Sequence, residues 1–346
     1  MATLDPRFSA GRLRYVNDDE PGITRRRRGK GFSYTTASGR AVCRSGDVAR
    51  IRALAIPPAW TDVWICLDPD GHIQATGRDE KGRKQYRYHD QWHADRGSAK
   101  YALLAEFARN LAKLRKAIDA DLRRHGLPRE KVIASVVWLM DHTMIRVGNE
   151  SYARDNKSFG LTTLRSRHVE ITGTKLQFRF KGKSGKEWIV GLSDRRMARV
   201  LRAIEHLPGQ RLFRYRDEDG LHDVASHDVN DYIRNAIGER FSSKDFRTWG
   251  GTLRALTMLA ETEVPDTTSA KARALNCVID TVSQYLGNTR AVCRSCYVHP
   301  TVIERWERGL LSKDLSGISA KRPRRSGLDT QECVAAVWLE KYAGRR

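Results

Sequence analysis

The chain has few cysteines and no long apolar segment. Six cysteines are spread over 346 residues, which argues against a disulfide framework and is typical of a reducing compartment. No uninterrupted apolar run approaches the roughly 18 residues that a membrane span needs. The first residues, from Met1 to Pro6, contain no apolar core of a secretory signal. We therefore expect a cytoplasmic protein with no membrane partner.

Negative charge is also scarce. Only 41 Asp and Glu residues oppose 63 Lys and Arg residues, which leaves a formal net charge of +22. The excess extends over the whole chain, and a basic surface of that extent indicates a large polyanion such as double-stranded DNA as the partner. Each DNA phosphate that it neutralises would contribute about −0.9 to the salt slope of the log affinity. A ribosomal protein or a merely solvated basic surface would have the same composition.

The residue pattern over the first ninety positions is typical of β-strands. Val63, Ile65 and Leu67 alternate with other side chains, a turn follows at residues 68–71, and the alternation then resumes. Residues 62–77 are therefore predicted to form a hairpin. A basic stretch with two interleaved tyrosines follows at residues 81–88. Its cations would meet DNA phosphates while its rings pack against sugars or bases, and a solvated basic strand is the alternative.

From about residue 103 the hydrophobic period changes to that of a helix. The apolar residues of this segment, spaced by three and four, are Leu103, Phe107, Leu111, Leu114, Ile118 and Leu122. They predict one long helix, and a second helix is predicted from Glu130 to about Met144. A further hairpin is predicted at residues 176–190, with its tip at residues 182–186. Residues 312–327 are expected to form a flexible basic loop before a last short helix.

These patterns predict two domains and an α+β fold class. The change of period places the boundary near residues 92–98. We expect a small β-rich N-terminal domain at residues 1–95. A larger, mainly α-helical domain at residues 96–346 would then contain the hairpin with Lys183 at its tip.

Three short motifs are too incomplete to predict a metal or nucleotide site. His89 and His93 are four residues apart, but the residue after the first His is Asp, not the Glu of a zinc-protease helix. Residues 182–184 resemble the end of a phosphate loop, but the glycine required five residues before the first of them is missing. Cys293 and Cys296 lack the further ligands of a structural zinc site. We expect no metal and no cofactor.

Five blocks of the chain hold residues suited to breaking a phosphodiester bond without a metal. This reaction needs an in-line nucleophile, cations on the non-bridging oxygens and a proton for the leaving 5′ oxygen. Tyrosine suits the first task because its phosphodiester stores the bond energy, and arginine suits the second because it is a permanently charged fork. In order, the blocks are residues 144–169 with Arg146, Phe180-Lys181-Gly182-Lys183, residues 244–250 with Arg247, Leu286-Gly287-Asn288-Thr289, and Ser295-Cys296-Tyr297.

Together these blocks resemble the catalytic blocks of type IB DNA topoisomerases, most closely the compact bacterial and poxvirus-type enzymes. Pro57-Pro58-Ala59-Trp60 and Gly82-Arg83-Lys84-Gln85-Tyr86 resemble the N-terminal domain of the same enzymes, so the likeness spans about residues 30–300. The resemblance implies the fold that type IB topoisomerases share with tyrosine recombinases, with the N-terminal domain at residues 1–95 closing as a clamp around DNA. It also implies a monomeric enzyme that relaxes positive and negative supercoils through a 3′-phosphotyrosyl intermediate, without ATP or metal.

The resemblance also implies a role for each site residue. Tyr297 would be the nucleophile, and Arg146 and Arg247 would hold the scissile phosphate. Lys183 would protonate the leaving 5′ hydroxyl, and Asn288 would donate a neutral hydrogen bond to a phosphate oxygen. In the N-terminal domain, the residues expected to contact DNA are Arg78, Lys84, Gln85, Tyr86 and Tyr88.

Two other functions remain as alternatives. Tyrosine recombinases use the same residue types, but they usually have His-x-x-Arg at the second arginine, where this chain has Lys244-Asp245-Phe246-Arg247. A non-enzymatic chromosomal DNA-binding protein would explain the net charge, but it would not require five ordered blocks.

Overall fold

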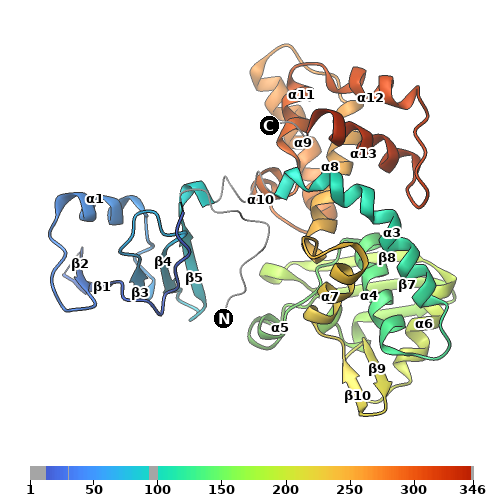
Figure 1. Ribbon diagram of the computed structural model, residues 1–346, viewed down its shortest axis with the longest axis horizontal. Helices are drawn as coiled ribbons and strands as arrows, with labels where there is room; N and C mark the ends of the chain where they lie inside the picture. Colours follow the sequence, from blue (N-terminus) through green and yellow to red (C-terminus); the bar gives the residue numbers. More distant parts are fainter. Residues whose placement is uncertain (1–12, 30, 93–99, 344–346) are drawn as a thin grey trace. The chain divides into compact units, whose positions relative to one another are not determined.

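The computed structural model describes residues 13–29, 31–92 and 100–343, and it divides into two compact units, Met1–Lys100 and Tyr101–Arg346 (Figure 1). The first six residues, His93 and the expected boundary between residues 95 and 96 lie outside the described residues, so what was expected of them stays a prediction. Among the described helices, none is both long and apolar enough to cross a bilayer.

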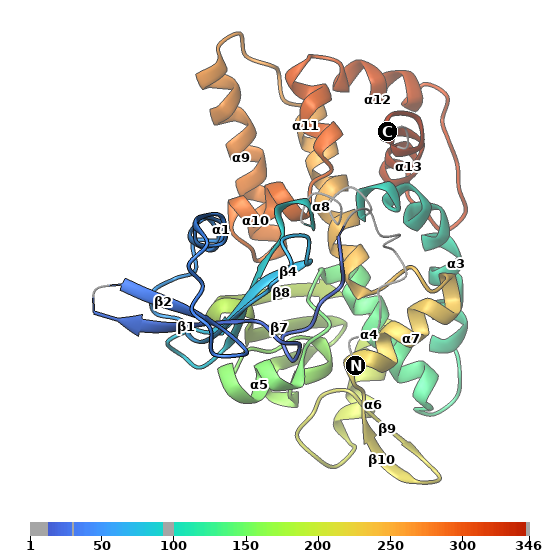
Figure 2. The same cartoon turned by 60° about the vertical axis from the view of Figure 1, so that its left-hand side comes forward.

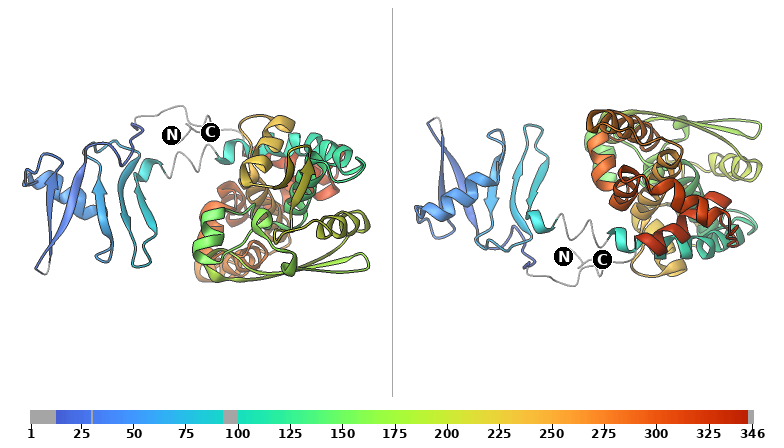
Figure 3. Two further views of the ribbon diagram at one scale, coloured as in Figure 1. Left: turned by 90° about the horizontal axis from the view of Figure 1, so that it is seen from below. Right: turned by 90° about the horizontal axis from the view of Figure 1, so that it is seen from above.

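The first unit is a five-stranded antiparallel sheet in the order β2-β1-β3-β4-β5, with one helix over a face of it (Figure 3). Its elements are β1 (Ile23–Arg28), β2 (Gly31–Thr36), α1 (Ser45–Ala53), β3 (Thr61–Ile65), β4 (Ile73–Arg78) and β5 (Lys84–Tyr88). The predicted hairpin is confirmed, because β3 pairs with β4 and places Ile65 opposite Ala75. Both residues are fully buried, and Ile51 of α1 packs in the same small core.

The second unit is mostly helical, so the predicted α+β class is confirmed. Its helices are α3 (Leu104–Leu122), α4 (Arg129–Thr143), α5 (Glu150–Asn156), α6 (Arg195–Glu205), α7 (Ser226–Ile237), α8 (Ser243–Ala260), α9 (Thr268–Leu286), α10 (Arg290–Cys296), α11 (Pro300–Glu307), α12 (Leu311–Ser319) and α13 (Thr330–Tyr342). Its strands are β6 (Val169–Thr172), β7 (Lys175–Lys181), β8 (Glu187–Ser193), β9 (Arg214–Asp217) and β10 (Gly220–Asp223).

Helix α8 is the centre of this unit. It packs against three helices that precede it in the chain, α3, α4 and α7. It also packs against four that follow it, α9, α11, α12 and α13 (Figure 2). Helices α3 and α4 confirm the two helices that the apolar spacing predicted. The inward residues of α3 are buried from Leu104 to Leu122, and α4 begins directly after Pro128, which has an extended conformation at the N-cap.

The predicted hairpin at residues 176–190 is also confirmed. Strand β7 pairs with β8 in register, and its residues alternate between buried and exposed, with Leu176, Phe178 and Phe180 inside. Lys183 lies at the tip, between the two strands. Period-two alternation settles which face of a strand is buried, so this hairpin was readable from the sequence.

The expectation of a flexible loop at residues 312–327 is wrong for its first half. Helix α12 extends to Ser319 and places Leu311, Leu315 and Ile318 against the core. This is the i, i+4, i+7 spacing of a helix, which the basic residues that follow it obscured. In the second half, Arg325 forms an ion pair with Glu340 of α13 at 2.8 Å, so that half is anchored to a helix.

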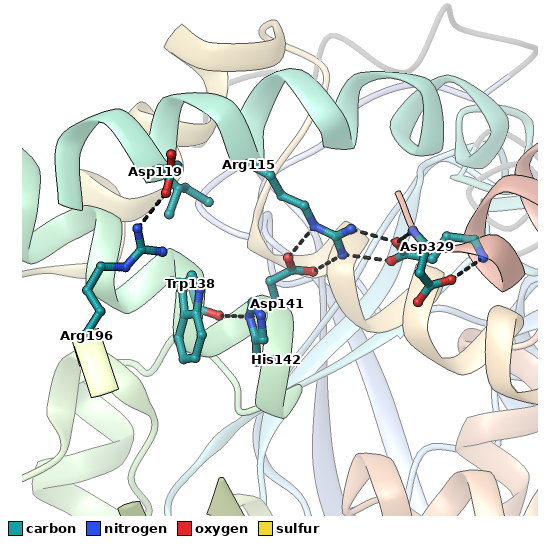
Figure 4. Close-up of a pocket in the computed structure, with 9 residues that line it drawn as sticks. Arg115, Asp119, Trp138, Asp141, His142, Arg196 and Asp329 are labelled. Carbon is teal, nitrogen blue, oxygen red and sulfur yellow. Dashed lines mark hydrogen bonds and ion pairs between the residues drawn. The ribbon is translucent and has the colours of Figure 1, made fainter. Parts of the chain in front are cut away.

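A buried ion-pair network ties three helices of this unit together (Figure 4). Arg115 of α3 lies 2.8 Å from the carboxylate of Asp141 in α4 and 2.7 Å from that of Glu332 in α13. Burial alone would raise the pKa of Glu332, but hydrogen bonding and ion pairing with Arg115, with a smaller contribution from Trp249, hold the pKa below its ordinary value. Because Trp249 belongs to α8, the network also reaches the central helix.

We predict that Glu332→Gln lowers the free energy of unfolding at pH 7 by roughly 1.5–3 kcal/mol, the range for a charge-assisted hydrogen bond. A lowered folded-state pKa stabilises the fold above the ordinary glutamate pKa, and this stabilisation is lost as the pH falls through the folded-state value. The difference between the two proteins should therefore shrink below about pH 4.5. Urea unfolding followed by tryptophan fluorescence measures it.

The matched control is Asp155→Asn, which breaks the exposed pair of Arg154 and Asp155. An exposed pair contributes at most about 1 kcal/mol. The network's role would be contradicted if the two variants lost equal free energy of unfolding. It would also be contradicted if the loss in Glu332→Gln did not change with pH.

Candidate active site

The structure brings four of the five predicted site residues into one pocket of about 440 Å³. They come from distant elements: Arg146 follows α4, Lys183 is at the β7–β8 tip, Arg247 is in α8, and Tyr297 caps the C-terminus of α10. The fifth residue, Asn288, lies in the turn between α9 and α10 and accepts a hydrogen bond from the guanidinium of Arg146.

The segment that bears Arg146 has a fixed backbone. Helix α4 ends at Met144, which adopts a left-handed conformation with φ 56°, and this turns the chain sharply. The carbonyl of Arg146 then accepts a hydrogen bond from the amide of Leu161 at 2.9 Å. Gly160 permits this approach, because a Cβ there would lie 2.6 Å from the carbonyl oxygen of Arg146. The guanidinium of Arg146 therefore projects from a turn whose backbone is held by this hydrogen bond.

Arg247 is almost completely buried, with 4% of its surface exposed. Its guanidinium donates to two backbone carbonyls, that of Met144 and, at 2.6 Å, that of Leu286. The same guanidinium lies 5.1 Å from the centre of the Tyr297 ring. Burial lowers the pKa of Arg247. The C-terminal carbonyls of α4 and α9 thus hold this cation, as helix C-termini commonly do.

The two arginines are close enough to disfavour each other's charge. Burial, and then the charge of Arg247, lower the pKa of Arg146 to about 10, so Arg146 is still a cation at neutral pH. Among the described residues that line the pocket there is no Asp or Glu. Buried charges are ordinarily paired. The pocket therefore has an excess of positive charge, which a phosphate group would reduce.

Hydrogen-bond donors without an acceptor also indicate that the pocket suits a phosphate group. Within the described part of the chain, Nε of Arg247 and Nδ2 of Asn288 are buried and have no well-aligned hydrogen-bond acceptor. The Asn288 amide lies next to the Cys293 thiol, whose pKa burial raises, so this thiol is neutral at pH 7. Unmatched buried donors are costly in an empty protein, and an oxyanion would satisfy them.

Helix α8 holds the backbone of Tyr297 by close contact. A Cβ on Gly251 would lie 2.7 Å from the carbonyl oxygen of Tyr297, and one on Gly250 would lie 2.6 Å from the sulfur of Met144. The hydroxyl of Thr252 donates to the Tyr297 carbonyl at 3.1 Å. None of Gly250, Gly251 and Thr252 is among the predicted site residues, although Gly250 ends the block at residues 244–250. Two consecutive glycines inside a helix are the signal, because each costs about 1 kcal/mol relative to alanine and therefore indicates a close approach.

Lys183 is exposed and borders the pocket from the hairpin tip. The next residue, Ser184, is left-handed with φ 64°, and Gly185 follows with φ 73°, so the tip is a tight turn. Other polar residues that line the pocket and were not predicted are Asn149, Tyr152, Ser158, Ser226, Asn230, Ser243 and Lys244. They are far from the five blocks or lie within them as unremarkable polar positions, so no spacing rule selects them.

The predicted DNA contacts of the N-terminal unit lie on β4 and on the edge strand β5. Tyr86 is exposed and stacks on Tyr88, with 5.9 Å between ring centroids. Lys84 forms an ion pair with Asp18 at 2.6 Å, and Gln85 donates to Asp79 at 2.9 Å.

The last of these residues, Arg78, lies 3.6 Å from Asp62 and donates to the carbonyl of Gly82. The ring of Tyr86 is thus presented at the surface and that of Tyr88 is half-buried beneath it, whereas the three longer polar side chains already have protein partners.

Among the described residues, no group of three His, Cys, Asp or Glu side chains is placed to hold an ion. Cys293 is buried and Cys296 is exposed, and both are free thiols. His89 is described, whereas His93 is not.

Comparison with known proteins identifies the family. A model described as the catalytic core of eukaryotic DNA topoisomerase I matches residues 89–316, and one described as the N-terminal domain of bacterial DNA topoisomerase IB matches residues 31–79. The chain is 34% identical over 294 residues to DNA topoisomerase 1B of Acanthamoeba polyphaga mimivirus, which covers 83% of this chain and 88% of that protein.

More distant relatives are also named as DNA topoisomerases. DNA topoisomerase 1 of Rabbit fibroma virus (strain Kasza) is 26% identical over 76% of this chain and 82% of its own length. DNA topoisomerase 1B of Vaccinia virus (strain Western Reserve) is 21% identical over 66% of this chain and 70% of its own length. The chain therefore belongs to the type IB DNA topoisomerases and is an isomerase that acts on DNA.

Proposed function

We propose that this enzyme relaxes positive and negative supercoils by nicking one strand through Tyr297 and resealing it, with no ATP and no metal. The observation that supports this most is the pocket itself. It combines the buried Arg247 and the half-buried Arg146 with two lysines and Tyr297, and there is no carboxylate among its described lining residues. A site of that composition suits a phosphodiester whose negative charge increases in the transition state.

In the proposed cleavage step, the phenolic oxygen of Tyr297 attacks the scissile phosphorus and loses its proton to water. The bond from phosphorus to the 5′ oxygen breaks, and Lys183 gives a proton to that oxygen as it leaves as a hydroxyl. Arg146 and Arg247 bind the non-bridging oxygens, and Asn288 donates a neutral hydrogen bond. The 3′-phosphotyrosyl bond stores the energy of the broken bond, so the 5′ hydroxyl reseals the strand by the reverse attack.

The N-terminal unit would add DNA contacts through the exposed Tyr86 and its stacked neighbour Tyr88, with Arg78, Lys84 and Gln85 as further candidates. Aromatic faces pack against sugars and bases irrespective of sequence. All five proposed catalytic residues come from one chain, so we propose a monomer. Because its substrate is chromosomal, we place it on the nucleoid in the cytoplasm.

The decisive experiment is plasmid relaxation in EDTA without ATP. Supercoils of both signs should relax completely, because no step uses a metal or a nucleotide. A strict need for magnesium or ATP would overturn the proposal. Strand exchange without relaxation would identify a tyrosine recombinase, and DNA binding without either reaction would identify a chromosomal packaging protein.

We predict that Tyr297→Phe lowers the yield of covalent protein–DNA adduct by at least about a thousandfold, as expected when a nucleophile is removed. Non-covalent DNA affinity should be nearly unchanged, because the ring remains. Denaturing gels measure the adduct and filter binding measures the affinity. The control is Tyr285→Phe, at a half-buried tyrosine next to Arg254 that is outside the pocket lining. An adduct of ordinary yield in Tyr297→Phe would mean that another residue is the nucleophile.

We further predict that Gly251→Ala slows single-turnover cleavage by about a hundredfold, the cost of misplacing a reacting group by about 1 Å. The added Cβ would meet the backbone of Tyr297 and displace the nucleophile. DNA affinity should change little. Gly317→Ala is the matched control, because Gly317 is in helix α12 with open space around it. Cleavage at the normal rate in Gly251→Ala would show that the close contact does not set the position of Tyr297.

A further inference from the structure

The hairpin that bears Lys183 is anchored close to its tip by a buried tryptophan. Trp188 of β8 is 6% exposed and stacks on Phe180 of β7, with 6.0 Å between ring centroids. A Cβ on Gly182 would lie 2.7 Å from Cδ1 of this indole, and one on Gly287 would lie 2.5 Å from its Cε2 and Cζ2. The indole is therefore wedged between the residue before Lys183 and the residue before Asn288.

A lysine on the other side of the tip makes a second link. Nζ of Lys186 donates to the carbonyl of Asn288 at 2.7 Å. The carbonyl of Lys186 accepts from the amide of Gly182 at 2.8 Å, which closes the turn around Lys183. Both flanks of Lys183 are thus attached to the turn at residues 286–288.

The same three-residue turn also holds both arginines. The carbonyl of Leu286 accepts from Arg247 at 2.6 Å, and the side chain of Asn288 accepts from Arg146. One short segment therefore contacts every cation of the proposed reaction, either directly or through the hairpin. A free hairpin tip would move on a nanosecond to microsecond scale, and such motion would take the lysine out of reach of the leaving oxygen.

We propose that Trp188 and Lys186 are positioning residues that dock the Lys183 hairpin on the 286–288 turn, so that proton donation and phosphate binding occur in one fixed geometry. This inference rests on the proposed role of Lys183 as the proton donor. Neither residue touches the reacting atoms. Each acts by restricting where the lysine ammonium can be when the 5′ oxygen leaves.

The test compares two DNA substrates in single-turnover cleavage. One has the natural 5′ oxygen at the scissile bond, and the other has a 5′-bridging sulfur, which leaves as a thiolate and needs no proton. Trp188→Phe keeps an aromatic ring on Phe180 but is too small to fill the space against Gly287. Lys186→Met keeps the aliphatic stem and removes the donor. We expect both variants to slow cleavage of the oxygen substrate by about 10–100-fold, part of the roughly 10²–10⁴ that a general acid contributes.

Rescue by the sulfur substrate is the result that identifies positioning. Both variants should cleave the sulfur substrate at close to the rate of the unsubstituted enzyme, as Lys183→Ala should. Neither substitution should slow the oxygen substrate further in a Lys183→Ala background, because groups that act as one unit are not additive. Lys175→Met, at the other end of β7 and exposed, is the control and should cleave both substrates normally.

The outcomes separate this inference from the function on which it rests. If Lys183→Ala is not rescued by sulfur, the proposed acid is wrong. If Lys183→Ala is rescued but the two variants slow both substrates equally, they act through the arginines or through folding, and the docking proposal is overturned. Normal cleavage of the oxygen substrate by both variants would overturn it as well.

Discussion

The active site depends on one electrostatic constraint, the burial of Arg247 beside a second arginine. Two backbone carbonyls, of Met144 and Leu286, take the place of the carboxylate that a buried guanidinium usually has. They accept from its two terminal nitrogens but carry no full charge, so the pocket keeps an excess of positive charge. A scissile phosphate would relieve this excess, and the arginines would hold it most strongly when its charge increases. Full neutralisation by a protein carboxylate would remove that preference.

Close packing maintains this unfavourable arrangement. Two adjacent glycines of α8 let Met144 approach one side of the helix and Tyr297 the other, so a single helix sets both an arginine acceptor and the proposed nucleophile. The same helix contributes Trp249 to the network of Glu332 and Arg115. The C-terminal helix α13 thereby supports the catalytic helix, although it contributes no residue to the pocket lining.

Much of the fold was predictable, because it is encoded over short stretches. The spacing of Leu103 to Leu122 and the alternation in β7 each repeat several times, and both elements formed as predicted, except that Leu103 is the half-buried N-cap and Leu104 is the buried residue. Helix α12 was missed because its apolar face is only three residues long and basic residues follow it. The β9–β10 hairpin was missed too, since its four-residue strands are mostly polar. Short elements of this kind are stabilised by contacts with the rest of the unit, and sequence periodicity contains little trace of such contacts.

The sequence by itself determined the class of fold, the positive charge that suits DNA and the identity of five candidate site residues. It did so because periodicity, composition and ordered motifs are all properties of the linear chain. Only the tertiary structure decided that four of these residues share a pocket without a carboxylate among its described lining, and that Gly251 closely approaches the backbone of Tyr297 while Trp188 and Lys186 contact the turn at residues 286–288. The physical reason is that a close approach or an unpaired charge is defined by distance. Residues far apart in the chain come within that distance only through packing.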